Sequence, residues 1–301
     1  MSSSIGDVSQ IPKQETQTQP GLQHEMAPHP VSYDMVGGNG HFEPYKAAGK
    51  LQGRKALITG GDSGIGRSVA FLFAKEGVDG ITIFYHPREE KDAADTKKDV
   101  QGNSKCKVLT YALDVGEVEQ VKKGIQEHVK AFGHIDILVN NAAEQHVCKS
   151  IEEIPDEQFE RTFKTNIYGY FFVAKYALPH MKSGGSIINT TSVTAYRGSA
   201  GLLDYSSTKG AIVTFTRSLS QQLAPKGIRV NGVAPGPIWT PLVAASFSPD
   251  KLENFGKGQV PMDRAGQPSE VATAYVFLAG PDSSYYTGQI FHPNGGTIVN
   301  T

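Results

Sequence analysis

The chain has 301 residues, of which 39% are hydrophobic and 20% are charged, and its formal net charge at pH 7 is −1. This length suffices for one large α/β domain, and the near-neutral charge argues against a nucleic-acid or anionic-membrane partner. No apolar run approaches the length of a membrane span. Two cysteines are too few for a disulfide framework, which favours a reducing, cytoplasmic location.

The first fifty residues differ from the rest of the chain. They are rich in Gln, Pro, Ser, Gly and His, and they contain no arginine and no apolar segment typical of a secretory signal. This composition predicts a disordered or loosely packed extension, residues 1–50, that drapes over the body. A passive tail and a role in packing or assembly both stay open. Residues 51–301 show no internal repeat and no linker, so we expect them to form one domain.

From Leu51 onward, short apolar runs alternate with amphipathic stretches. We expect strands at residues 55–59, 81–85, 107–111, 136–140, 186–191, 229–233 and 289–292. We expect helices at residues 63–75, 89–101, 117–132, 156–181, 202–223 and 269–278. This alternation predicts an α/β fold with a single doubly wound parallel sheet and helices on both faces. Ligands of such sheets bind beyond the carboxyl ends of the strands, where the strand order reverses.

A glycine-rich turn, Thr59 to Gly66, follows the first strand of this body and opens its first helix. Gly60 permits a tight turn, Gly64 lets a pyrophosphate approach the backbone, and Gly66 allows close helix packing. The amino end of the helix then stabilises the phosphates. Because the turn lies between a strand and a helix, it predicts a dinucleotide site rather than a purely structural turn.

A second group of residues is suited to acid–base chemistry. Tyr205 and Lys209 are four residues apart on a predicted helix, so their side chains share one face. A neighbouring ammonium lowers the pKa of a phenol, which is ordinarily about 10. Ser192 ends the preceding strand and can reach the phenol. Tyr-x-x-x-Lys alone is common by chance, but with the other motifs it predicts proton transfer to or from a carbonyl or alcohol oxygen, with Tyr205 as general acid/base.

Cofactor choice is predicted from the residues that follow the strand at 81–85. An NAD enzyme usually places an acidic side chain there, but this chain has His86, Pro87 and Arg88. A missing carboxylate and a nearby guanidinium favour NADP(H). The alternative is that Arg88 is a solvated residue at the start of a helix, so NAD(H) stays possible.

Two further features have alternative interpretations. His146 and Cys148 have no second pair at metal-ligand spacing, so no metal site is predicted. Four apolar residues follow Pro235 and Gly236, and they form either a substrate lid or ordinary packing. They are Trp239, Leu242, Phe247 and Phe255.

Taken together, residues 51 to 301 resemble the classical short-chain dehydrogenase/reductases, whose fold is of the Rossmann type. The turn at 59–66 is similar to the family's TGxxxGxG loop, and residues 140–143 are similar to its NNAG motif, with Ala143 in place of the usual glycine. Residues 61–63, 141–145, 235–241 and 292–296 resemble the subgroup called glucose/ribitol dehydrogenase homologues.

The resemblance implies roles for individual residues. The catalytic set would be Asn166, Ser192, Tyr205 and Lys209. Ser192 would stabilise charge on the substrate oxygen, Lys209 would bind the nicotinamide ribose and lower the pKa of Tyr205, and Asn166 would hold a water path. The cofactor contacts, with His86 and Arg88 added, would be Gly60, Asp62, Ser63, Gly64, Ile65, Gly66, Asp114, Val115, Asn141, Ala142, Tyr205, Lys209, Pro235, Gly236, Ile238 and Thr240.

We therefore expect an NAD(P)-dependent oxidoreductase that interconverts a carbonyl and an alcohol by hydride transfer. Its substrate is either a sugar or polyol, or a ketone, aldehyde or quinone-like metabolite. The alternative is a non-catalytic dinucleotide-binding interaction protein, which the complete catalytic set argues against.

The resemblance also suggests a homotetramer. An apolar terminal segment, 291–299, and aromatic residues on helix 156–181 provide a physical reason; these aromatic residues include Phe159, Phe163, Tyr170, Phe171, Phe172 and Tyr176. The alternative is a monomer.

Overall fold

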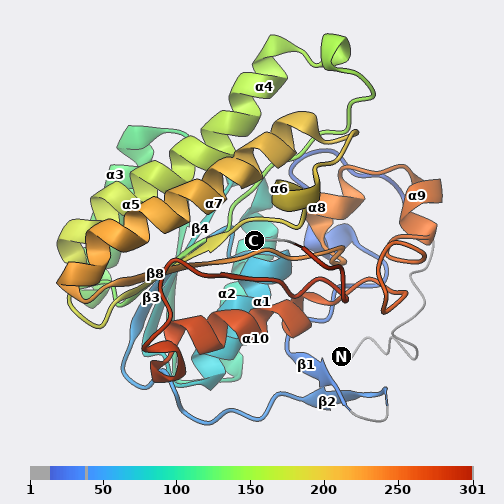
Figure 1. Cartoon of the computed structure of the whole chain (residues 1–301). Coiled ribbons are helices and arrows are strands. Elements are labelled where there is room, and N and C mark those ends of the chain that lie inside the picture. The colour runs from blue at the N-terminus through green and yellow to red at the C-terminus, as the bar shows by residue number, and fades with distance from the viewer. Residues whose placement is uncertain (1–13, 38–39, 300–301) are drawn as a thin grey trace.

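A seven-stranded parallel sheet forms the middle layer of the molecule (Figure 1). Its strands are β3 (Lys55–Thr59), β4 (Gly80–Tyr85), β5 (Lys107–Ala112), β6 (Ile137–Asn140), β7 (Ser186–Thr190), β8 (Arg229–Val233) and β9 (Ile290–Phe291). They lie in the order β5-β4-β3-β6-β7-β8-β9, so the direction of winding reverses between β3 and β6. The predicted doubly wound sheet is confirmed. The structure, a computed structural model, describes residues 14–37 and 40–299.

Helices cover both faces of the sheet, as Figure 1 shows. One face is covered by α1 (Gly64–Lys75), α2 (Glu90–Gly102) and α10 (Pro268–Ala279). The other is covered by α3 (Val118–Phe132), α5 (Gly169–Ala177) and α7 (Leu203–Leu223). Most of these bounds agree with the predicted ranges to within one or two residues.

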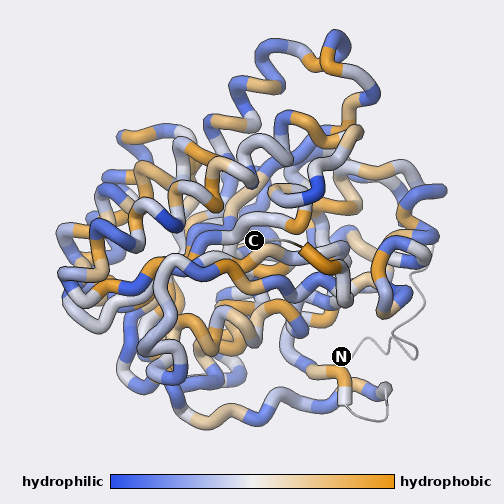
Figure 2. Tube along the Cα trace, viewed as in Figure 1, coloured by the Kyte–Doolittle hydropathy of each residue, from blue (hydrophilic) through white to orange (hydrophobic). Residues whose placement is uncertain are grey.

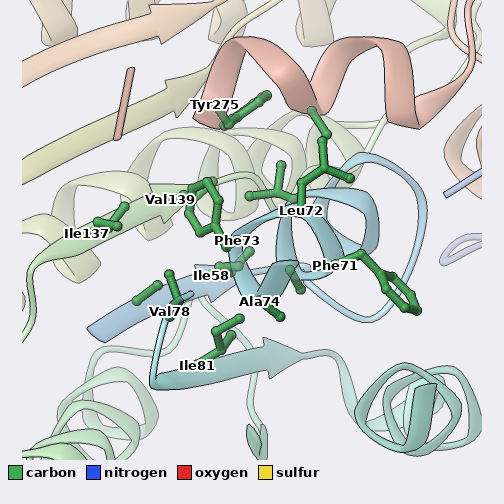
Figure 3. Close-up of a cluster of buried hydrophobic side chains, with 14 of the residues drawn as sticks. Ile58, Phe71, Leu72, Phe73, Ala74, Val78, Ile81, Ile137, Val139 and Tyr275 are labelled. Atoms are coloured by element: carbon green, nitrogen blue, oxygen red, sulfur yellow. The ribbon is translucent and has the colours of Figure 1, made fainter. Parts of the chain in front are cut away.

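The core consists of two apolar layers, one on each side of the sheet. All six residues of β4 are buried, because helices cover both faces and no alternation with polar residues is needed. Figure 2 shows hydrophobic and hydrophilic residues alternating along the helices, as expected of helices with one face on a sheet. Figure 3 shows Leu72 and Phe73 of α1 between Tyr275 of α10 and the strand residues Ile58 and Val139.

The single helix predicted at 156–181 is interrupted in the structure. The helix α4 (Asp156–Phe163) passes into a π-helical turn, Lys164–Tyr168, before α5 begins. A 3-10 turn, Leu178–His180, follows α5 and contains Pro179, which has no N–H to continue an α-helix. The π turn matters for the site because it contains Asn166.

Residues 14–37 and 40–50 pack against the body, where the sequence predicted a disordered or loosely packed extension. They include an antiparallel pair, β1 (Asp34–Val36) and β2 (Phe42–Pro44). The backbone N–H of Ser269 donates to the carbonyl oxygen of Val31 at 3.1 Å, and Met26 is buried in an apolar cluster with Trp239. Residues 1–13 and 38–39 lie outside the described residues, and the domain boundary at residue 50 stays a prediction.

Candidate functional site

A cavity of about 950 Å³ lies at the carboxyl ends of the strands. It is lined by loops that follow β3, β4, β5, β6, β7 and β8, so the sheet's switch point is at its base. Every residue predicted to be catalytic or cofactor-binding lines this cavity, except Gly66 and Asn166. Residues as far apart in the chain as Gly60 and Thr240 therefore converge where the sequence predicted a ligand.

The glycine-rich turn between β3 and α1 forms a backbone cradle. Gly60 and Gly64 have φ angles of 61° and 50°, a region of backbone conformation that residues other than glycine rarely adopt. A Cβ on Gly66 would lie 2.0 Å from the carbonyl oxygen of Gly60. Only glycine therefore lets α1 start this close to the strand. The amino end of α1 lies at the cavity and fits the phosphates of a dinucleotide.

Tyr205 and Lys209 lie on α7 and are both buried, with exposed fractions of 8% and 1%. The Lys209 ammonium lies 5.3 Å from the centre of the Tyr205 ring, and its Nζ donates to the carbonyl oxygen of Thr190 at 3.0 Å. Ser192, two residues after β7, lies close enough to Tyr205 to affect its ionisation. The predicted acid–base group is thus brought together at one wall of the cavity.

Burial controls the ionisation of this pair. It raises the pKa of Tyr205 to about 12, although the nearby Ser192 acts in the opposite direction. Burial also lowers the pKa of Lys209 to about 7. The expected lowering of the Tyr205 pKa by Lys209 is not observed, because desolvation disfavours the charged form of both groups. The phenol of Tyr205 is therefore protonated at neutral pH.

Asn166 is fully buried and supports the cavity wall without lining the cavity. Its Oδ1 accepts from the backbone N–H of Glu144 at 2.8 Å, and its Nδ2 donates to the carbonyl oxygen of Glu144 at 2.9 Å and to Oγ1 of Thr208 at 3.1 Å. It therefore joins the π turn to the loop after β6 and to α7. π turns inside helices often occur at functional positions.

A charged network that was not predicted lies along the same wall. Glu144 accepts from Nε of Arg161 at 2.9 Å and lies 2.7 Å from Nε2 of His146. Arg161 also pairs with Asp114, one of the predicted cofactor contacts. Burial raises the pKa of Glu144, but hydrogen bonds and charge from His146 and Arg161 outweigh it and lower the pKa. Arg161 lies on α4 with no motif to mark it, whereas Glu144 lies in the loop whose sequence was singled out.

The end of the cavity beyond β4 contains carboxyl groups beside the predicted His86 and Arg88. Asp62 is buried, and its carboxylate oxygens make no hydrogen bond of good geometry within the part of the chain described. Burial raises the pKa of Asp62 to about 7, and burial followed by the charge of Asp62 raises the pKa of Glu89 to about 9. Burial lowers the pKa of His86. The sequence showed no acid directly after Tyr85, but the fold brings two acids to this end.

The apolar segment after Pro235 packs in a buried cluster and also borders the cavity, and its role as a substrate lid stays a prediction. Trp239 is buried and its Nε1 donates to the carbonyl oxygen of Pro28 at 3.2 Å, so it packs. Leu242, Phe247 and Phe255 line the cavity and form an apolar wall.

No group of three or more His, Cys, Asp or Glu side chains within residues 14–37 and 40–299 is arranged to hold a metal ion. Across these same ranges, none of the helices combines the length and the apolar character needed to cross a membrane.

Comparison with known proteins gives a consistent result. The family described as Enoyl-(Acyl carrier protein) reductase matches residues 60–297. The chain is 54% identical to the "Glucose and ribitol dehydrogenase" of Daucus carota, over 97% of this chain and 98% of that protein. It is 53% identical to "NADPH-dependent aldehyde reductase 1, chloroplastic" of Arabidopsis thaliana, over 96% of this chain and 98% of that protein. A crystal structure from Brucella melitensis, a short-chain dehydrogenase/reductase described as glucose/ribitol dehydrogenase, is 33% identical, with a TM-score of 0.76 over 83% of this chain and 99% of that one.

Proposed function

The chain belongs to the short-chain dehydrogenase/reductase family of oxidoreductases, and we propose that it reduces a carbonyl to an alcohol, reversibly, at the cavity described above. The observation that carries this proposal is the buried Tyr205, adjacent to Lys209 and lining the same cavity as Ser192, with a glycine cradle at the other end of that cavity. The cradle and the amino end of α1 fit a nicotinamide dinucleotide.

The cofactor, when bound, supplies hydride to the carbonyl carbon or accepts it from the alcohol. As the carbonyl oxygen gains charge, Tyr205 donates its phenolic proton to that oxygen, which completes the alcohol. The hydroxyl of Ser192 donates a hydrogen bond to the same oxygen and stabilises its developing charge. Lys209 holds the cofactor ribose. Asn166 fixes the position of α7 relative to the loop that follows β6. Because burial raises the pKa of Tyr205 to about 12, the phenol stays protonated at neutral pH, which is the form that the proton donor in reduction requires.

We further propose NADPH as the preferred cofactor and an aldehyde, including the open form of a sugar, as the substrate. The Arg88 guanidinium at the cavity supports the first choice, because it can pair with the 2′-phosphate. Asp62 and Glu89 would repel this phosphate if ionised, but burial raises the pKa of both groups and favours their neutral forms. The names of the two plant relatives, one an NADPH-dependent aldehyde reductase and the other a glucose and ribitol dehydrogenase, support both choices.

The assembly and the compartment belong to the same proposal. Phe159, Tyr168 and Phe171 on the α4–α5 side are 42%, 52% and 48% exposed, and a homotetramer would cover them. Cys106 and Cys148 are free, in accord with a reducing compartment such as the cytosol.

The test is NADPH consumption with a panel of aldehydes, ketones and sugars, using wild type and Tyr205→Phe. We expect wild type to oxidise NADPH with an aldehyde, and we expect the variant to lose turnover while it retains cofactor affinity, because the ring remains and only the proton is lost. Cofactor affinity is measured separately by nicotinamide fluorescence. Undiminished turnover in Tyr205→Phe would contradict the mechanism. Cofactor binding without turnover of any substrate by wild type would instead favour the non-catalytic alternative.

A further inference from the structure

The amino-terminal arm crosses the mouth of the cavity. Residues 16–24, called the strap below, run from the side of the cavity formed by α8 (Pro241–Ala244) to the side formed by α1 and α2. In Figure 1 the blue amino-terminal chain lies beside α8, far in sequence from the orange segment next to it. Gln19, Pro20 and Gly21, in the middle of the strap, line the cavity.

The first end of the strap is attached to the segment that follows Thr240. The backbone N–H of Gln17 donates to the carbonyl oxygen of Ala244 at 3.0 Å, and Oγ1 of Thr16 donates to the carbonyl oxygen of Phe247 at 3.0 Å. Nε2 of Gln19 donates to Oγ of Ser246 at 3.0 Å. This segment also carries the apolar wall of the cavity, so the strap and the wall are held as one unit.

Gly21 explains how closely the strap approaches this side. A Cβ on Gly21 would lie 2.1 Å from the carbonyl oxygen of Pro241. Any side chain here would push the strap away from the residue that directly follows Thr240, a predicted cofactor contact. The close approach therefore requires glycine at position 21, which a loosely placed tail would not need.

The second end of the strap is attached to the glycine cradle and to α2. Oε1 of Gln23 accepts from the backbone N–H of Gly64 at 2.7 Å. The buried carboxylate of Asp92 accepts from the backbone N–H groups of Gln23 and His24 at 2.7 and 3.0 Å, and lies 2.8 Å from Nδ1 of His24. Gln23 itself is 4% exposed. The strap thus touches the backbone that would hold the phosphates.

We infer that the strap is a structural part of the dinucleotide site: it closes the outer side of the cavity over the phosphates and controls the rate at which the cofactor leaves. This rests on the proposed function, because it takes the cavity to be a dinucleotide site. Three consecutive strap residues line the cavity, and both ends are bonded to elements predicted to contact the cofactor. A bound dinucleotide would lie beneath the strap, so its release requires at least one end of the strap to detach.

The first experiment measures the dissociation rate of NADPH and of NADH by stopped-flow nicotinamide fluorescence. The double variant Gln19→Ala/Gln23→Ala removes one side-chain attachment at each end of the strap. We expect it to release cofactor on the order of tenfold faster than wild type, since the side chains of Gln19 and Gln23 together make three hydrogen bonds to the body. Thr18→Ala is the matched control, because Thr18 is an exposed residue of the same strap. It should release cofactor at the wild-type rate.

The outcomes separate this inference from the function it rests on. If wild type binds neither NADPH nor NADH, the proposed function fails. If wild type binds cofactor and the double variant releases it at the wild-type rate, the strap inference is wrong.

A second measurement needs no variant. Hydrogen exchange of wild type reports strap opening through the backbone N–H groups of residues 17, 22, 23 and 24, each of which is hydrogen-bonded. Saturating cofactor should slow their exchange several-fold, while the amides of β1 and β2, in the same arm, exchange as before. Unchanged exchange in the strap of the cofactor-saturated protein would also overturn the inference.

Discussion

At the scale of single residues, burial sets the direction of the pKa shift for four groups in the cavity, whereas the pKa of Glu144 follows its partners His146 and Arg161. Tyr205 and Lys209 both shift toward their neutral forms, as do the carboxyl groups of Asp62 and Glu89. Desolvation has this effect in any deep cavity, since the charged form loses more hydration energy than the neutral form. Where Asp62 and Glu89 are neutral, they do not repel an anionic dinucleotide.

Arg88→Ala tests the cofactor choice at this scale. Loss of a charged hydrogen bond to the 2′-phosphate should lower the ratio of kcat/KM for NADPH to that for NADH by roughly ten- to a hundredfold. Lys91→Ala, an exposed cation three residues further along, is the control for a general loss of positive charge. A wild-type preference for NADH, or a ratio that Arg88→Ala leaves unchanged, would reject NADP specificity through Arg88.

Asp62 and Glu89 predict how this preference changes with pH. Burial raises the pKa of Asp62 to about 7 and that of Glu89 to about 9, so both ionise as the pH rises. Their negative charge then repels the 2′-phosphate, and we expect the preference for NADPH over NADH to fall between about pH 6 and about pH 9. In Asp62→Asn, the part of this fall nearest pH 7 should disappear. The measurement is the kcat/KM ratio of the two cofactors as a function of pH, and a flat wild-type profile would contradict the prediction.

At the scale of elements, polar groups buried between helices and strands decide where several elements meet. Asn166 holds the π turn to the loop after β6, and His128 holds α3 to β4. Nδ1 of His128 lies 2.7 Å from Oγ1 of Thr82, and its Nε2 lies 3.0 Å from the carbonyl oxygen of His134. Both ring nitrogens are satisfied in the neutral form.

Burial lowers the pKa of His128 to about 4, which makes folding stability depend on pH. The unfolded chain takes up a proton near pH 6.5, whereas the folded chain does so only near pH 4. Stability is therefore complete above the unfolded pKa and is lost as the pH falls toward the folded pKa, by up to about 3 kcal/mol. The free energy of unfolding in urea, measured from about pH 7 to about pH 4, should show this loss. His128→Gln, which does not titrate, should show a smaller one; an equal loss in both proteins would contradict the assignment to His128.

At the scale of the whole molecule, the exposed aromatic surface on the α4–α5 side is the main unexplained feature. Tyr170 is buried against the sheet, but Phe159, Tyr168 and Phe171 are not. We expect sedimentation equilibrium at micromolar concentration to show a tetramer, because such a surface is costly to leave in water. Phe171→Glu should weaken the assembly without changing the helical content. A species of 32.4 kDa that does not change with concentration would contradict the tetramer.

The sequence by itself determined the alternation of strands and helices, the glycine turn and the spacing of Tyr205 and Lys209. These are local properties, because they depend on the spacing of hydrophobic residues and on backbone freedom over a short stretch of the chain.

Tertiary structure decided what depends on distant neighbours. Burial set the direction of the Tyr205 and Lys209 pKa shifts, and folding brought Asp62 beside Glu89 and Arg161 beside Asp114. The placement of the strap was also decided by the fold. The strap is mostly polar, and its hydrogen-bond partners lie as much as 231 residues away in the chain. Composition alone could not distinguish such an arm from a free tail.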